Sequence, residues 1–362
     1  MPDKRIIQHV DWWLLLSLLL IMGLGFINLN SASIATGYPF QWKQLQWYSA
    51  GLVLMAVMIL FDYRVLLRYA VHIYSLVLAL LVLVLVVGKT VGGSQRWLPL
   101  GFFNLQPSEF AKLAIVILVA RIIALDRKES YAFRDLLRLA ALLFPPVILI
   151  NLQPDLGTSL LLIAIAGSMI LLATIRWTTV VTIACVCVGG LPLVWKFLKP
   201  YQRRRIEIFL NPENDPLGSG YHVIQSKIAV GSGQVFGKGY GKGTQAHLDF
   251  LPEVHTDFAF SIWAEEWGFV GAVILVILFA VLLWRCVSIA ASTRERFGTF
   301  LVFGSAAMIF WQVFINTCMV TGLMPVVGIP FPFISYGGSS VLTACMGLGL
   351  VLNVRARRFL FP

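Results

Sequence analysis

A few acids and one lysine stand at the starts of long apolar runs in this sequence. Glu109, Lys112, Asp155 and Asp257 each lie within a few residues of such a start. Ionisable side chains at these positions are costly to bury in a membrane, and they are commonly retained for function. An acid placed there could act in proton transfer, and a lysine could bind a phosphate group. These residues are therefore the first candidates for chemistry.

Each candidate also has a purely structural interpretation. Glu109 and Lys112 are three residues apart, so they can form an ion pair on one helix face, with Ser108 as the N-cap. Asp155 can cap the helix that follows it. Asp257 lies in a first turn, where an acid suits the helix dipole, although the scarcity of acids in the chain favours a catalytic role. The residues alone leave these alternatives open.

Two further features could suggest function. Glu265 and Glu266 lie two turns deeper than Asp257, so at least one of them must face a cavity or a partner. The glycine-rich stretch 231–243 resembles a nucleotide-binding loop only superficially, because no Ser or Thr directly follows a Gly-Lys pair at P-loop spacing and no strand precedes the glycines. We expect it to be flexible backbone beside an interfacial helix.

The composition explains why so few polar residues stand out. The chain has 362 residues, of which 59% are hydrophobic and 12% charged, against about 25% charged in an ordinary soluble domain. This excludes a water-soluble globule, and ten apolar runs are candidates for helices that satisfy their own hydrogen bonds in lipid. We predict one all-α polytopic membrane domain, residues 1–362, with about ten transmembrane helices. The runs cover residues 12–30, 47–61, 69–87, 108–124, 136–150, 158–174, 180–197, 256–287, 297–322 and 339–354.

The basic residues indicate how these helices are oriented. The formal charge is +11, but most Lys and Arg residues lie between apolar runs, which favours a topology signal over nucleic-acid binding. Sixteen of them fall in one set of short connections and three in the opposite set. Both termini are thus expected in the cytoplasm, with the first run as an uncleaved helix. Four polar stretches then begin on the outer face and converge there: QPSEFAK (106–112), QPDLGT (153–158), HTDF (255–258) and SYGGSS (335–340).

The connection of residues 198–255, between the seventh and eighth spans, is expected to be a long extracytoplasmic loop. Long structureless loops are unusual and commonly functional. The pattern within it predicts an amphipathic helix in the membrane interface. The apolar face of this helix is formed by Tyr221, Ile224 and Ile228. A basic run at Arg203, Arg204 and Arg205 could bind anionic lipid head groups or a diphosphate, or could simply be solvated.

Taken together, these stretches resemble the SEDS family (shape, elongation, division and sporulation proteins). The segment 316–340 is similar to the family signature without a gap, and the resemblance extends to 95–97 (QRW), 106–109, 153–158 and 251–258. It covers nearly the whole chain. Further stretches are more similar to the elongation branch than to the division branch, namely 211–222 and 243–250. Gln234 and Trp267 depart from the family pattern, which affects loop detail only.

This resemblance implies a glycosyltransferase of the bacterial inner membrane that polymerises lipid II into β-1,4 glycan strands, at the periplasmic face and during cell elongation. It also implies a class B penicillin-binding protein, which is a transpeptidase, as partner, together with other proteins of the elongation complex. The essential acid of the family matches Asp257. The other cavity residues of the family match Glu109, Lys112, Asp155 and Ser335.

The residue types suit that reaction. Asp257 could act as the general base toward the acceptor hydroxyl, while Lys112 and an arginine of the run 203–205, such as Arg203 or Arg204, would neutralise the departing diphosphate. A Mg²⁺ or Mn²⁺ ion could join the phosphates to Asp155 or Asp257, although the sequence has no dedicated metal motif. No organic cofactor is expected.

Two other functions are compatible with the sequence. A lipid II flippase would also have many spans with acids at their ends, and the Glu109 and Lys112 pair could serve as its gate. Against this, the candidate residues gather on the outer side rather than at the membrane midplane. A non-catalytic scaffold would tolerate substitution of Asp257.

Overall fold

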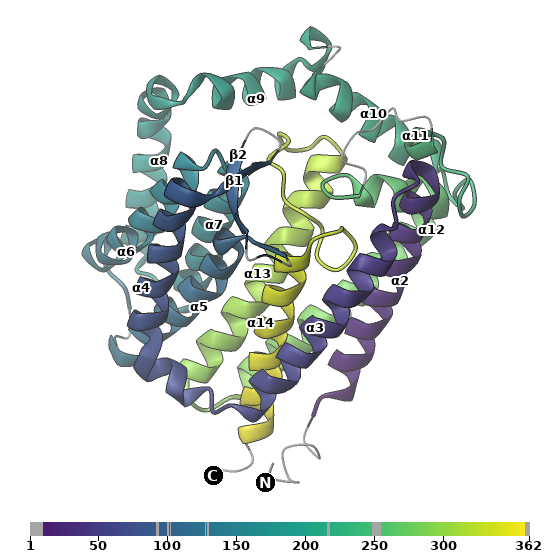
Figure 1. The fold of residues 1–362 in the computed structure, drawn as a ribbon. Coiled ribbons are helices and arrows are strands. Elements are labelled where there is room, and N and C mark those ends of the chain that lie inside the picture. Colours follow the sequence, from purple (N-terminus) through teal and green to yellow (C-terminus); the bar gives the residue numbers. More distant parts are fainter. Residues whose placement is uncertain are drawn as a thin grey trace.

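The computed structural model describes residues 10–91, 94–99, 101, 103–126, 128, 130–215, 218–247 and 255–358. Ten helices of this part coincide with the ten predicted spans, so the fold prediction is confirmed. Figure 1 shows them as one bundle. They are α2 (Trp12–Thr36), α3 (Phe40–Leu60), α4 (Arg64–Val87), α5 (Pro107–Asp126), α6 (Phe133–Leu152), α7 (Leu156–Leu172), α8 (Trp177–Phe197), α12 (Ala259–Ser292), α13 (Arg296–Val320) and α14 (Gly338–Arg357). Within the described part, six of these helices are long and apolar enough to cross a membrane, namely α2, α4, α6, α12, α13 and α14.

Small residues let the central helices approach one another closely. A methyl group added at Gly349 of α14 would lie 2.8 Å from Cβ of Met58 in α3. Such residues at helix crossings are typical of membrane proteins, in which packing rather than water exclusion holds helices together. The peripheral helices α4 and α6 instead leave apolar side chains such as Val86 and Phe144 exposed. These surfaces suit contact with lipid.

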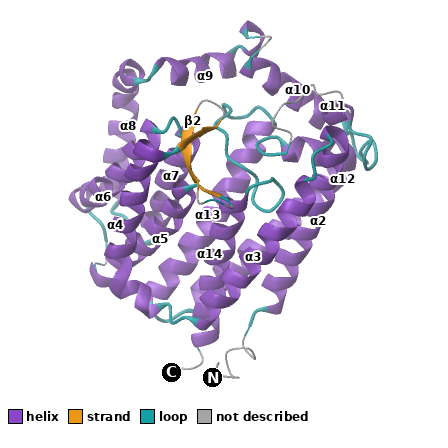
Figure 2. Ribbon diagram, in the orientation of Figure 1, coloured by secondary structure: helices purple, strands orange, loops and turns teal. Residues whose placement is uncertain are grey.

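A three-stranded antiparallel sheet joins α4 to α5, and it was not predicted. Its strands are β1 (Lys89–Val91), β2 (Ser94–Pro99) and β3 (Asn104–Leu105), in that order. Strands this short carry too little alternation to be recognised in a sequence. Figure 2 shows the sheet in orange, on the side of the bundle that faces α9. Its main consequence is positional, because β2 carries Arg96 to the start of α7.

The connection predicted as a loop at 198–255 is largely helical where the structure describes it. Its residues 216–217 and 248–254 lie outside the described part. It contains α9 (Pro200–Leu210), the 3₁₀ helix η1 (Pro212–Asn214), α10 (Ser219–Ser232) and α11 (Thr244–His247). These elements cross one end of the bundle (Figure 1). The chain therefore covers this end with packed helices rather than with irregular backbone.

Helix α10 is the predicted amphipathic helix, and the face that packs on the bundle differs from the apolar face predicted to meet the membrane interface. Its buried residues are Val223, Ser226 and Ala229, whereas Ile228 is 45% exposed. The Ser226 hydroxyl donates to the Val320 carbonyl at 2.5 Å. The packed face thus includes a buried serine with a backbone partner, which holds α10 against the end of α13.

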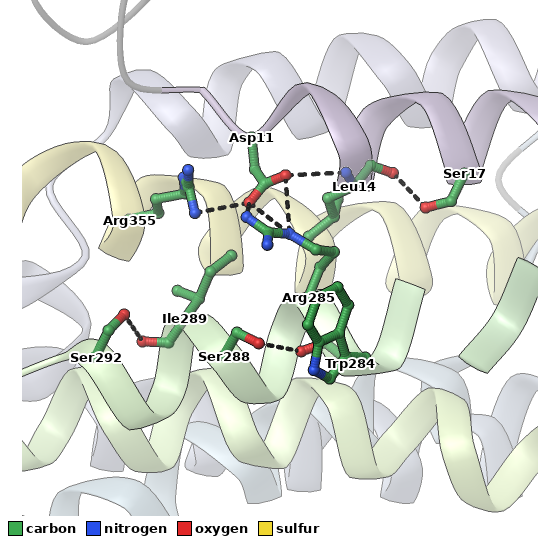
Figure 3. Close-up of polar contacts among 9 residues, drawn as sticks. All are labelled: Asp11, Leu14, Ser17, Trp284, Arg285, Ser288, Ile289, Ser292 and Arg355. Carbon is green, nitrogen blue, oxygen red and sulfur yellow. Dashed lines mark hydrogen bonds and ion pairs between the residues drawn. The ribbon is translucent and has the colours of Figure 1, made fainter. Parts of the chain in front are cut away.

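An ion cluster ties three helices together at the opposite end of the bundle. Figure 3 shows the carboxylate of Asp11 between Arg285 of α12 and Arg355 of α14. Its Oδ2 lies 2.5 Å from Nη2 of Arg285 and 2.7 Å from Nη1 of Arg355, and its Oδ1 accepts a 3.1 Å hydrogen bond from the Leu14 N–H. Asp11 is also the N-cap of α2. The first and last helices therefore meet at this end.

The Asp11 cluster predicts a pH-dependent stability. Burial alone would raise the pKa of Asp11, but the hydrogen bonds from Arg285 and the Leu14 N–H, with the charges of Arg355 and Arg285, outweigh it and lower the pKa below 3.8. The ionised carboxylate thus stabilises the fold above pH 3.8, and this contribution is lost as the pH falls through the lowered value. We expect Asp11→Asn to lower the free energy of unfolding by about 2–3 kcal/mol at pH 7.

Unfolding in detergent at several pH values would test this, and the difference between Asp11→Asn and the parent protein should shrink toward pH 3. Asp62→Asn is the matched control, because Asp62 is half-exposed and lies 3.6 Å from Arg357. It should cost less than about 1 kcal/mol. Equal costs at the two positions would contradict the assignment.

Candidate functional site

The four polar stretches come together through contacts between the starts of helices. The Gln106 N–H, just before α5, donates to Ser339 Oγ in α14 at 3.1 Å. A methyl group added at Gly157 in α7 would lie 2.6 Å from the Val327 carbonyl oxygen, and one added at Gly328 would lie 3.2 Å from Oδ2 of Asp257. The predicted convergence of these stretches is therefore confirmed.

Asp155 is the N-cap of α7, as its structural interpretation predicted. Its Oδ1 accepts from the Thr158 N–H at 3.2 Å and its Oδ2 from the Thr158 hydroxyl at 2.9 Å. Arg96 of β2 lies against the same turn: its Nε donates to the Gln153 carbonyl at 3.1 Å, and Nη2 donates to the Pro154 carbonyl. Nη1 of Arg96 lies 3.8 Å from Oδ1 of Asp155. Asp155 is 1% exposed. Its carboxylate is therefore buried, and it is held both by its hydrogen bonds to Thr158 and by the nearby charge of Arg96.

Asp257 lies in the turn that leads into α12, and tertiary contacts fix its backbone. The Asn316 side chain of α13 donates to the Asp257 carbonyl at 2.9 Å. Two residues earlier, the His255 carbonyl accepts from the Tyr336 N–H at 2.7 Å, and the His255 ring stacks on Phe40 with centroids 4.1 Å apart. Three separate segments therefore hold this turn.

Arg205 is the arginine of this run whose pKa is affected by the charges of both carboxylates. The side chain of Arg204 is 69% exposed and pairs with Asp215 at 3.3 Å, while Arg203 donates to the Lys196 carbonyl at 2.8 Å. Arg204 thus lies on the exposed side of α9, where it pairs with the largely buried Asp215, and its contact with substrate stays a prediction. A run of three adjacent arginines on a helix points in three directions, so the sequence could not show which one turns inward.

Arg205 lines a small cavity beside α9, and its pKa is affected by the charges of Arg96, Asp155 and Asp257. The cavity is lined by Arg205, Ile208, Phe209, Val223 and Val326. Burial lowers the pKa of Arg205 and the nearby charge of Arg96 lowers it further, whereas Asp155 and Asp257 act to raise it. Nη1 of Arg205 is buried without a hydrogen-bond partner among the described residues. A guanidinium remains charged in such a place, so it is suited to an anion.

Glu109 and Lys112 form the predicted ion pair. Lys112 Nζ lies 2.6 Å from Oε2 of Glu109, and the two residues are 1% and 3% exposed. Ser108 does not act as the predicted cap, since its buried hydroxyl has no hydrogen-bond partner within the described part of the chain. The pair can share the cost of its burial, but removal of one partner would leave a buried charge.

Ser335 is placed by its own loop rather than toward open space. Its hydroxyl accepts from the Phe331 N–H at 2.9 Å, and its carbonyl accepts from the Gln44 side chain at 3.2 Å. Gln44 also accepts from the Gly337 N–H at 3.2 Å. These bonds fix the loop that leads into α14, and they hold Ser335 in that loop.

A family model described as "Cell cycle protein", for FtsW, RodA and SpoVE, matches residues 7–359. This chain belongs to the FtsW/RodA/SpoVE family. The resemblance to SEDS proteins drawn from the sequence motifs is thereby confirmed.

Individual relatives match along almost the whole chain. The peptidoglycan glycosyltransferase MrdB of Escherichia coli strain K12 is 41% identical over 99% of this chain and 97% of its own length. Stage V sporulation protein E of Bacillus subtilis is 38% identical over 95% and 96%. Among solved structures, the rod shape determining protein RodA of Thermus thermophilus is 32% identical, with a TM-score of 0.73 over 97% of this chain and 98% of that one. A chain from a peptidoglycan synthase complex, studied for the coordination of polymerization and crosslinking, is 35% identical with a TM-score of 0.82 over the same shares.

The glycine-rich loop of this FtsW/RodA/SpoVE member is docked on α12 rather than flexible, which corrects the sequence-based expectation. The Lys238 N–H donates to the Glu265 carbonyl at 3.0 Å, and Lys238 Nζ lies 2.5 Å from Oε1 of Glu265. Glu266 accepts from the Ser31 hydroxyl. The two buried glutamates therefore face partners, as expected. The loop lies at a break in α12 at Gly268, whose φ of 63° suits glycine.

Sequence reasoning missed two residues of the site in this family member, Arg96 and Asn316, and it left open which arginine of the run 203–205 takes part. Arg96 and Asn316 lie in stretches that carried the family resemblance, but nothing in their spacing indicated which distant backbone they would contact. No group of three or more His, Cys, Asp or Glu side chains arranged for a metal occurs among the residues that the structure describes.

Proposed function

We propose that this protein is a peptidoglycan glycosyltransferase that polymerises lipid II into β-1,4 glycan strands. The observation that carries the proposal is that Asp257 and the turn of Asp155 both adjoin residues 327–329 at one end of an apolar bundle, where both acids also act on the pKa of Arg205. Relatives that match nearly the full chain are named peptidoglycan glycosyltransferases. Acids beside a buried cation suit a transfer reaction with an anionic leaving group.

In the proposed reaction, the acceptor sugar's 4-hydroxyl oxygen forms a bond to the anomeric carbon of the donor. The bond from that carbon to the lipid diphosphate breaks, and the diphosphate leaves with the electron pair. Asp257 takes the proton of the hydroxyl as general base, a role worth about 10² to 10⁴-fold in rate. Arg205 stabilises the leaving diphosphate through charge-assisted hydrogen bonds. Lys112 would leave its ion pair with Glu109 and bind a phosphate of the substrate instead, so that its positive charge also stabilises the leaving diphosphate.

A divalent cation, Mg²⁺ or Mn²⁺, is part of the proposal. Carboxylate oxygens are the type of ligand that such ions prefer, and these ions usually bind through one or two carboxylates plus substrate phosphates. Asp257 and Asp155 would hold it, although both oxygens of Asp155 already accept hydrogen bonds from Thr158. When bound, the ion would neutralise charge on the diphosphate.

The proposed setting is the bacterial inner membrane, with both termini in the cytoplasm and the site facing the periplasm. The ends of the bundle support it: Asp11, at the start of α2, pairs with Arg355, at the end of α14. We also propose a class B penicillin-binding protein as partner, and elongation-complex proteins around it. The likeness to a chain of a peptidoglycan synthase complex supports a partner of this kind.

The direct test is polymerisation by the purified protein. Labelled lipid II in detergent, with Mg²⁺ or Mn²⁺ and with or without the transpeptidase, should give glycan ladders on a gel. Removal of Mg²⁺ and Mn²⁺ from the assay by a chelator should reduce the amount of glycan product. Absence of ladders, together with movement of lipid II across liposome membranes, would support a flippase instead.

Replacement of Arg205 should impair this reaction more than replacement of its neighbour. We expect Arg205→Ala to reduce the polymerisation rate by about 10² fold, as the loss of one charged donor to a developing anion commonly does. Arg204→Ala is the matched control on the same helix, because its side chain is 69% exposed and pairs with Asp215. Its rate should stay near that of the parent. Equal losses would argue against a special role for Arg205.

A further inference from the structure

One buried amide joins two segments that meet at Asp257. Asn316 of α13 is fully buried, and its Nδ2 donates to the Asp257 carbonyl at 2.9 Å and to the Ile329 carbonyl at 2.7 Å. Its Oδ1 has no hydrogen-bond partner among the described residues. Both hydrogens of the Asn316 amide group are therefore used in hydrogen bonds, and these two donated bonds are the contribution of Asn316 to the fold.

The segment that Asn316 holds adjoins both the Asp257 carboxylate and the first turn of α7, which Asp155 caps. Gly328 adjoins Asp257, because an added methyl group would lie 3.2 Å from Oδ2 of that residue. On the other side, a methyl group added at Gly157 would lie 2.6 Å from the Val327 carbonyl oxygen and 2.9 Å from Cγ1 of Ile329. Gly157 is two residues after Asp155, the cap of α7.

We propose that residues 327–329 act as a spacer that sets the separation of Asp155 and Asp257, with Asn316 and Gly328 as positioning residues. The spacer contacts the start of α7 through Val327 and the Asp257 carboxylate through Gly328. Asn316 joins the spacer to the Asp257 turn, because its side chain donates to the carbonyls of both Ile329 and Asp257. The inference rests on the proposed function of Asp257, and it adds residues that touch neither the sugar nor the diphosphate.

Glycine is required at 328 for two reasons. Its φ is +74°, which L side chains rarely adopt, and an added methyl group would lie so close to Oδ2 of Asp257, at 3.2 Å, that the carboxylate would have to move by a few tenths of an ångström. A side chain there would push the carboxylate away from its position. Small displacements of a reacting group reduce rates strongly while leaving the fold intact.

Gly328→Ala tests the spacer, and Gly37→Ala is its matched control. Gly37 has the same φ of +74°, but a methyl group added there meets no atom within 4 Å. The two variants therefore carry the same backbone strain, and only one disturbs Asp257. We expect Gly328→Ala to lower kcat by about 10-fold relative to Gly37→Ala, with KM for lipid II and the unfolding temperature changed equally in both.

A second pair of variants keeps the inference testable if Gly328→Ala does not fold. Asn316→Asp removes both donors without a change of size. Gln312→Glu, one turn away on α13, buries the same kind of charge but loses nothing, since Nε2 of Gln312 has no hydrogen-bond partner in the described structure. We expect kcat per folded molecule to fall about 10-fold further in Asn316→Asp than in Gln312→Glu.

Asp257→Ala in the same assay separates this inference from the proposed function. If Asp257→Ala is inactive but each positioning variant matches its control in kcat, the spacer role is wrong. If Asp257→Ala polymerises like the parent protein, the proposed role of Asp257 fails first. A fall in kcat confined to Gly328→Ala and Asn316→Asp supports the spacer.

Discussion

Asp257→Ala should yield a folded protein that makes no detectable glycan. The loss of a general base removes about 10² to 10⁴-fold in rate, and the Asp257 backbone remains held by Asn316, whose bond goes to the carbonyl rather than to the side chain. The fold should therefore survive the change. Product length on a gel, compared at equal amounts of folded protein, measures the effect.

Glu213→Ala is a suitable control for this experiment. Glu213 is an exposed acid of η1, in the connection that precedes Asp257, and its loss changes the net charge in the same way. It should polymerise like the parent protein. Ladders of normal length from Asp257→Ala would exclude the general-base role of Asp257.

Breaking the Glu109 and Lys112 pair should have the largest effect on stability. Either Glu109→Gln or Lys112→Met leaves the other charge buried without its partner at 2.6 Å. We expect each single change to lower the free energy of unfolding by about 3–5 kcal/mol. The double variant should recover most of that loss, because it removes both charges together. Thermal unfolding in detergent measures all three variants.

Activity of the double variant distinguishes the two interpretations of the pair. We expect it to be folded and yet poorly active, because a neutral methionine at position 112 cannot bind a phosphate as Lys112 is proposed to do. A double variant that is both stable and fully active would show that the pair is structural only. In that case Arg205 would remain as the cation proposed to meet the diphosphate.

Much of this protein could be predicted from its sequence because lipid imposes simple rules. Backbone in a membrane must bond to itself, so apolar runs long enough to span it predict helices, and each of the ten runs overlaps one helix and extends at most three residues beyond it. Local rules held as well: Asp155 caps α7, and Glu109 pairs with Lys112 three residues away. These features depend on residues close together in the chain.

Contacts between distant residues could not be predicted in this way. Arg96 reaches Pro154, 58 residues away, and Asn316 reaches Asp257, 59 residues away. The packed face of α10 depends on the Val320 carbonyl, which accepts from Ser226. A periodic pattern shows which side of a helix is polar, but not which partner will satisfy a polar group.

The sequence by itself therefore determined the helices, the clustering of their polar starts and the acids that could act. The tertiary structure decided which arginine turns inward at α9, what the two glutamates of α12 contact, and how Asp155 and Asp257 are spaced. The physical reason is that hydrogen bonds and ion pairs between separate helices depend on how those helices pack. Packing is a property of all the helices together, and no single stretch of sequence encodes it.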